Sequence, residues 1–100
     1  MRVQFVQSGG FAGAVKGCEL DTEALAPDAT GELEQLVRKS GITKSGESLS
    51  ETGRDLHQYE ITIKEGKRMT RVVVDDATIP PPAKPLLGFL KKHARPGAPG

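Results

Sequence analysis

The stretch LHQYEITIKEGKRMTRVVVD, residues 56–75, decides the fold because it carries the clearest strand pattern in the chain. In its first half, apolar or aromatic side chains alternate with polar ones, at His57, Tyr59, Ile61 and Ile63. A tight-turn signal follows at Glu65-Gly66. The alternation then resumes, with one face made by Thr70, Val72 and Val74. Two such runs around a short turn predict a β-hairpin over residues 56–75.

The first twenty residues predict another hairpin, over residues 2–20. Val3 and Phe5 alternate with polar neighbours, which is typical of a strand. A glycine-rich run then predicts a connecting turn, with the sequence Ser8-Gly9-Gly10-Phe11-Ala12-Gly13. A weaker strand pattern leads back to Leu20.

Two further segments predict helices. Residues 27–40 place a proline in the first turn, acidic side chains toward the N-terminal end and basic side chains toward the C-terminal end. An apolar stripe at helical spacing supports this helix, and Gly41 is placed to end it. The three prolines at 80–82 predict an extended linker, and Pro85 then opens a last helix with a broad apolar stripe.

The predicted order of elements is ββαββα, which indicates an α+β fold: a four-stranded antiparallel sheet with two helices packed on one face. One hundred residues support one modest core, so we expect a single domain over residues 1–93. Residues 94–100 are rich in proline and glycine and predict a flexible C-terminal tail. The polar segment from Thr43 to Asp55 predicts an exposed loop.

Composition argues against several classes of protein. Fourteen Lys and Arg against thirteen Asp and Glu give a formal net charge of +1, which disfavours nucleic-acid binding. The single cysteine excludes an internal disulfide. No apolar run approaches the roughly 18 residues of a membrane span, and the first residues lack the apolar region of a signal peptide. We therefore expect a cytoplasmic monomer that binds neither nucleic acid nor membrane.

Candidate catalytic groups are sparse. The chain has two histidines and one cysteine, and neither a metal-ligand motif nor a nucleophile elbow. We interpret His57 as a half-buried or edge histidine, and His93 as a cap at a helix C-terminus. We interpret Cys18 as a small buried hydrophobe and Asp75-Asp76 as a strand end. The sequence thus predicts no catalytic residues, no metal site and no cofactor.

The connection at residues 8–13 is the unusual feature of the sequence. It uses six residues where two suffice to close a hairpin, and Phe11 lies among small neighbours. Either Phe11 folds back over the edge of the sheet, or it projects as an anchor for the pocket of a partner protein. The residues alone leave both interpretations open.

The run Arg2-Val3-Gln4-Phe5, followed by Ser8-Gly9-Gly10-Phe11-Ala12-Gly13, resembles the start of the emfourin family. Further similar segments are Leu36-Val37-Arg38-Lys39-Ser40-Gly41, Tyr59-Glu60-Ile61-Thr62-Ile63, Val72-Val73-Val74-Asp75 and Pro85-Leu86-Leu87. The resemblance covers residues 1–90. Emfourins are small protein inhibitors of thermolysin-type zinc metalloproteases such as protealysin, so the resemblance implies a partner of that class.

The resemblance also implies a mechanism, which is competitive inhibition by the loop of residues 8–13. Phe11 would fill the apolar pocket that such proteases hold for the side chain after the cleaved bond. The Gly10 carbonyl would then approach the protease zinc. The alternative function is a non-inhibitory binding module that regulates another protein through the same loop. A small enzyme and a purely structural subunit are further alternatives.

Overall fold

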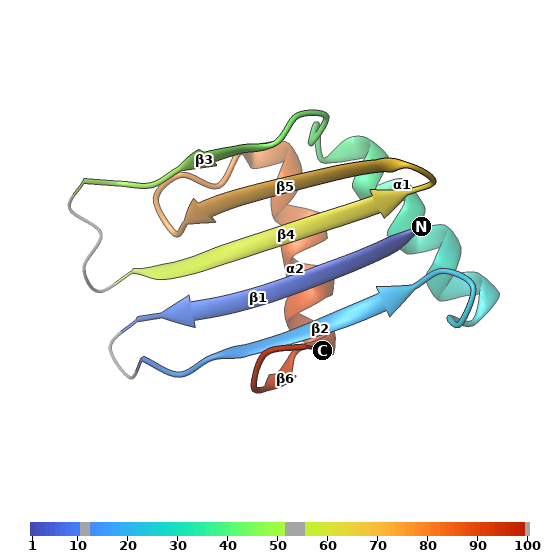
Figure 1. Cartoon of the computed structure of the whole chain (residues 1–100), viewed down its shortest axis with the longest axis horizontal. Coiled ribbons are helices and arrows are strands. Elements are labelled where there is room, and N and C mark those ends of the chain that lie inside the picture. The colour runs from blue at the N-terminus through green and yellow to red at the C-terminus, as the bar shows by residue number, and fades with distance from the viewer. Residues whose placement is uncertain (11–12, 52–55, 100) are drawn as a thin grey trace.

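The computed structural model describes residues 1–10, 13–51 and 56–99. In chain order the elements are β1 (Arg2–Gly9), β2 (Lys16–Asp21), α1 (Pro27–Lys39), β3 (Gly46–Ser48), β4 (His57–Glu65), β5 (Arg68–Asp75), the 3₁₀ turn η1 (Pro81–Ala83), α2 (Lys84–His93) and β6 (Arg95–Pro96). The strands form one sheet, and both helices lie on the same face of it (Figure 1). The architecture is a two-layer α+β arrangement.

The sheet is larger than the sequence predicts. Its strand order is β3-β5-β4-β1-β2-β6, with β3 parallel to β5 and the other neighbouring pairs antiparallel. The predicted four-stranded antiparallel sheet and the ββαββα order are therefore wrong, because the described sheet is six-stranded and mixed. The four predicted strands make its centre, and β3 and β6 add one edge each.

Both edge strands lie where the sequence has no strand pattern. β3 falls in the segment predicted as an exposed loop, and β6 falls in the predicted tail. They are three and two residues long, and all of their residues are exposed, so they show no period-2 alternation. Their pairing with β5 and β2 is made by the backbone, which depends on position rather than side-chain identity. The division into a domain over 1–93 and a tail over 94–100 stays a prediction.

The two predicted hairpins are confirmed. β1 pairs with β2 as far as Gln7 and Lys16, and β4 pairs with β5 along its length. β1 also pairs with β4, as far as Gly9 and His57, and this contact joins the hairpins into one sheet. β1 and β4 are therefore the central strands.

The first predicted helix is confirmed as α1, which ends one residue before the predicted boundary. The Ser40 N–H donates to the carbonyls of Leu36 and Val37, at 3.0 and 3.2 Å. Gly41 follows with φ of 76°, the left-handed conformation that commonly ends a helix. The last predicted helix is confirmed as α2, with η1 directly before it.

The hydrophobic core lies between the helices and the central strands. Val3 and Phe5 of β1 lie opposite Ile63 and Ile61 of β4. Phe5 also stacks on Tyr59, with ring centroids 6.2 Å apart. The helices contribute the buried side chains of Leu33, Leu86, Leu87, Phe89 and Leu90. The alternation in the strands and the apolar stripes in the helices thus meet in one core.

The N-terminus is bound to the sheet at the end away from the β1–β2 connection (Figure 1). The Met1 ammonium donates to Thr22 Oγ1 at 3.0 Å, and the Thr22 N–H donates to the Met1 carbonyl at 2.9 Å. These bonds fix the start of β1 against the segment that follows β2.

Phe5 gives a direct test of this core, because its side chain is fully buried there and its strand β1 lies between β2 and β4. Phe5→Ala should lower the free energy of unfolding by about 3–5 kcal/mol, measured by urea denaturation. Met69→Ala is the control, since this side chain is 59% exposed and its loss should change stability by no more than about 0.5 kcal/mol. Equal effects of the two variants would contradict the packing described.

Candidate functional site

One end of the sheet gathers three connections between elements (Figure 1). β1, β3 and β5 end there, and β2 and β4 begin there. The connections run from β1 to β2, from β3 to β4 and from β5 to η1. We call this region the loop end of the sheet. The predicted binding loop, residues 8–13, lies in it.

The first arm of the predicted loop is part of the sheet. Ser8 and Gly9 are the last residues of β1, and they remain paired with β4. The Gly10 N–H continues this pairing, since it donates to the Leu56 carbonyl at 3.1 Å. The backbone before the tip of the loop is therefore fixed by a neighbouring strand.

The far side of the loop returns toward the first arm. The Gly13 N–H donates to the Gly10 carbonyl at 3.3 Å. Phe11 and Ala12 lie outside the described residues. The role of Phe11 as an apolar anchor, and the choice between its two interpretations, therefore stay predictions.

The two arms of the loop are held differently. β1 keeps its pairing with β4 as far as Gly9, whereas its pairing with β2 stops at Gln7 and Lys16. The second arm, residues 13–15, thus joins the hairpin only where β2 begins. The connection beyond the last β1–β2 pair is therefore residues 8–15, and the Gly13–Gly10 bond joins its two sides.

Gly10 lies directly against the His57 ring. A β-carbon added at Gly10 would be 2.6 Å from His57 Nε2 and 2.7 Å from His57 Cδ2. The φ angle of Gly10 is +75°, which L side chains rarely adopt. Both the backbone conformation and the imidazole therefore favour glycine at this position, and the ring packs against the backbone of the loop.

Asp76 holds His57 in place. The His57 N–H donates to Asp76 Oδ2 at 2.8 Å, and His57 Nδ1 lies 3.4 Å from the same oxygen. The Tyr59 hydroxyl donates to Asp76 Oδ1. Desolvation opposes ionisation of Asp76, but the bonds from Tyr59 and His57 outweigh it and hold its pKa below the ordinary value. The Gly10–His57–Asp76 contacts thus connect the loop to a carboxylate on the neighbouring connection.

Asp75 ties the β3–β4 connection to the β5–η1 connection. The Ser50 N–H donates to Asp75 Oδ2 at 2.5 Å, and the Ala77 N–H donates to Asp75 Oδ1 at 2.8 Å. The Thr78 hydroxyl accepts the Asp75 N–H at 2.9 Å and donates to the Ser48 carbonyl at 2.5 Å. The bond from Ser50 is the main cause that lowers the pKa of Asp75, and it acts against desolvation.

The remaining candidates do not join this site. Cys18 Sγ contacts the Leu90 carbonyl at 3.7 Å, and burial raises the pKa of its thiol to about 11. His93 Nδ1 lies 2.9 Å from the Phe89 carbonyl, near the C-terminus of α2. Within the described ranges, no group of three or more His, Cys, Asp or Glu side chains is placed to hold a metal ion. Neither described α-helix is long and apolar enough to cross a bilayer.

A family model for Emfourin matches residues 5–91. The match covers most of the chain, so the chain belongs to the Emfourin family, and its members are protein inhibitors of proteases. It follows that a protease is the partner class that the family implies. Comparisons with curated proteins and with solved structures returned no match.

Sequence reasoning found the loop but missed the residues that support it. His57 and Asp76 carry no motif, and both have common structural explanations in a strand and at a strand end. Their importance comes from the strand register, which places His57 opposite Gly9. An estimate of register from the paired hydrophobic patterns of β1 and β4 is the signal that could have found them.

Asp75 gives a pH-dependent test of the loop end. Its pKa is lower in the folded chain than the value of about 3.9 in unfolded chains, so its contribution to stability exists above about pH 4. That contribution is lost as the pH falls through the lowered value. In Asp75→Asn the amide would face a backbone donor, so the melting temperature should fall at pH 7. The difference in melting temperature between Asp75→Asn and wild type should become smaller below about pH 4.

The control for this test is Glu47→Gln, which neutralises an exposed carboxyl on β3. It should leave the melting temperature and its pH dependence close to those of wild type. If the melting temperatures of Asp75→Asn and wild type differ by the same amount from pH 7 to pH 3, the ionised carboxylate is not what stabilises the loop end.

Proposed function

We propose that this chain inhibits a thermolysin-type zinc metalloprotease by placing the loop of residues 8–13 in the active-site cleft. The observation that carries the proposal is the family match, which covers residues 5–91 and therefore the whole loop. The position of the loop at one end of the sheet supports the choice of contact surface (Figure 1). The proposal gives the chain itself no catalytic role.

In this proposal the loop binds as a substrate does. Phe11 fills the apolar pocket for the side chain after the cleaved bond. The Gly10 carbonyl faces the protease zinc and crowds its bound water. This oxygen has two lone pairs, so it can face the metal while it accepts the Gly13 N–H. Binding is then competitive with peptide substrates.

The fixed first arm supports slow cleavage of the loop. The bond from Gly10 to Leu56 exists before the protease arrives, so binding costs less ordering entropy than it does for a free peptide. After a cut between residues 10 and 11, the first arm would stay on β4 and the second arm would stay continuous with β2. The new ends would remain close to each other, which favours resealing over release.

β1 also offers backbone groups to the protease. Beyond Gln7, the edge of β1 that faces β2 has no paired strand in the described part of the chain. Ser8 and Gly9 are paired with β4 on their other edge. A protease strand can therefore add to the free edge of this short segment without displacing β4.

Substitution of Phe11 tests the proposed anchor. Phe11→Ala should weaken binding to a thermolysin-like enzyme by about 2 kcal/mol, or roughly thirtyfold in the inhibition constant. The measurement is a steady-state assay with a peptide substrate. Phe11→Leu should recover part of the loss, because it restores apolar volume for the pocket.

Met69→Ala is the matched control, since it removes an exposed apolar side chain from β5. It should inhibit as well as wild type. Full inhibition by Phe11→Ala would exclude Phe11 as the anchor. Absence of inhibition by the wild-type chain at micromolar concentration would favour the non-inhibitory binding module instead.

Loop length gives an independent test. One glycine inserted after Gly13 lengthens the second arm and loosens the loop, so inhibition should fall by roughly tenfold or more. Stability should change little, because the added residue lies outside the core. The readouts are the inhibition constant and the melting temperature. A large fall in melting temperature with a matched fall in inhibition would instead indicate that the loop serves the fold.

A further inference from the structure

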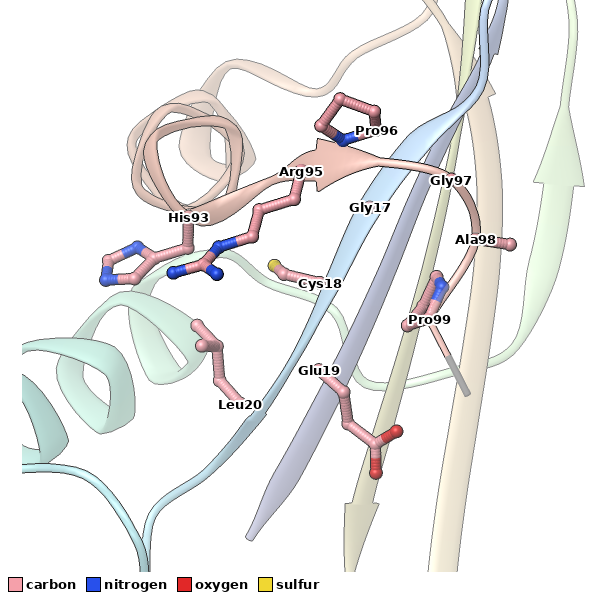
Figure 2. Close-up of a pocket in the computed structure, with 10 residues that line it drawn as sticks. All are labelled: Gly17, Cys18, Glu19, Leu20, His93, Arg95, Pro96, Gly97, Ala98 and Pro99. Atoms are coloured by element: carbon pink, nitrogen blue, oxygen red, sulfur yellow. The ribbon is translucent and has the colours of Figure 1, made fainter.

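The last described residues fold back onto the edge of the sheet (Figure 2). In β6, Pro96 and Arg95 pair with Lys16 and Gly17 of β2. The Gly97 N–H then donates to the Val15 carbonyl at 2.8 Å. We call residues 95–99 the C-terminal strap. It lies beyond the residues that match the Emfourin family.

The strap contacts the arm of the loop that β1 does not hold. Val15 lies in the second arm, directly before β2 begins at Lys16. The pairing between β1 and β2 stops at Lys16, so it does not include Val15. β4 thus fixes the first arm of the loop, and the strap fixes the second.

We propose that the C-terminal strap is a positioning element for the inhibitory loop. Its bond to Val15 and its pairing with β2 hold the second arm in place, so both arms are fixed before a protease binds. This inference rests on the proposed function, because it takes from it that the loop inhibits a protease. The attachment of the strap to β2 does not depend on it.

The strap also passes around the edge of β2. Figure 2 shows His93 on one side of this strand and Pro99 on the other. A β-carbon added at Gly17 would lie 2.8 Å from Pro99 Cδ and 2.2 Å from the Phe5 carbonyl oxygen. Pro99 therefore packs directly on the Gly17 backbone, and this contact adds to the strand pairing.

The strap is attached without being part of the core. Its residues are exposed or half-buried, and the buried cluster between sheet and helices contains none of them. A cavity of about 470 Å³ lies between the strap, β2 and the end of α2, and Cys18 and Leu20 line it (Figure 2). Removal of the strap should therefore free the loop arm while the domain stays folded.

Cys18 provides a readout of strap attachment that needs no protease. It is the only cysteine in the chain, and it lines the cavity that the strap borders. Its thiol is largely protonated and slow to react, because burial raises its pKa to about 11. Loss of the strap removes one wall of this cavity, so reagents should reach the half-buried thiol more easily.

The experiment compares the intact chain with a chain that ends at Ala94. The truncated chain should react with an aromatic disulfide reagent at pH 8 roughly fivefold faster or more. Its inhibition constant toward a thermolysin-like enzyme should rise roughly tenfold, and the enzyme should cut its loop faster. Circular dichroism should show a folded domain. Arg95→Ala is the matched control for inhibition and loop cleavage, since it removes the cation but keeps the backbone pairing, and it should match wild type in both. Its thiol reaction rate is not compared, because Arg95 lines the same cavity as Cys18.

Three other outcomes would each overturn the proposal. An unchanged thiol reaction rate would show that the strap is not attached in solution and would overturn the proposal. A faster thiol reaction with unchanged inhibition and loop cleavage would overturn the positioning role. A loss of inhibition in Arg95→Ala equal to that of the truncated chain would assign the effect to charge and also overturn it.

Failure of the proposed function is distinguishable from failure of the strap. If the intact chain inhibits no thermolysin-type enzyme, the proposed function is wrong. The backbone order of residues 13–17, measured by NMR relaxation, then decides on the strap alone. Lower order in the truncated chain supports the positioning role, and unchanged order overturns it.

Discussion

The pairing of β1 with β4 is the contact on which the loop end of the molecule depends. β1 is a central strand, fixed by the burial of Val3 and Phe5, so its exit from the sheet is determined by the core. It stays on β4 as far as Gly9 but leaves β2 after Gln7. This unequal pairing leaves residues 8–15 outside the β1–β2 ladder and keeps Gly10 against the His57 ring. A structural feature of the core thus controls the geometry of a surface loop.

The adjacent carboxylates of Asp75 and Asp76 connect the other segments of the loop end through hydrogen bonds. Asp75 bonds the connection that follows β3, and Asp76 bonds the start of β4. Each accepts hydrogen bonds from backbone or hydroxyl donors, and each has a lowered pKa, so both remain ionised near neutral pH. The Tyr59 hydroxyl completes the set and is kept protonated, because burial and the neighbouring carboxylate raise its pKa. The same residue stacks on Phe5, so the core and the loop end share a side chain.

The centre of the fold could be predicted from sequence because each central element buries one face, and burial imposes a period. The residues of β3 and β6 are themselves exposed, and backbone pairing leaves no such period in the sequence. The Val73 side chain lies on the face of the sheet away from the helices, since its neighbours Val72 and Val74 pack against the core. The structure buries it, between Glu47 of β3 and Glu60 of β4. That burial depends on the unpredicted strand β3.

The candidate site was also predicted only in part, because contacts between distant strands leave no local pattern in the sequence. Its glycine-rich loop has a local signature that identifies residues 8–13 without any knowledge of the fold. The contacts of His57 with Gly10 and of Gly97 with Val15 join residues far apart in the chain, so only the register of the sheet brings them together. The anchoring role of Phe11 and a cytoplasmic location stay predictions.

The bonds between Met1 and Thr22 have a practical consequence for handling the protein. They place residue 1 at the end of the sheet opposite the loop end (Figure 1). A peptide tag joined at residue 1 would keep a backbone N–H there as donor to Thr22. A tag joined at the other end of the chain would follow the strap, which lies beside β2. Immobilisation on a biosensor chip through the N-terminus would therefore leave the loop end of the sheet facing the flowing solution.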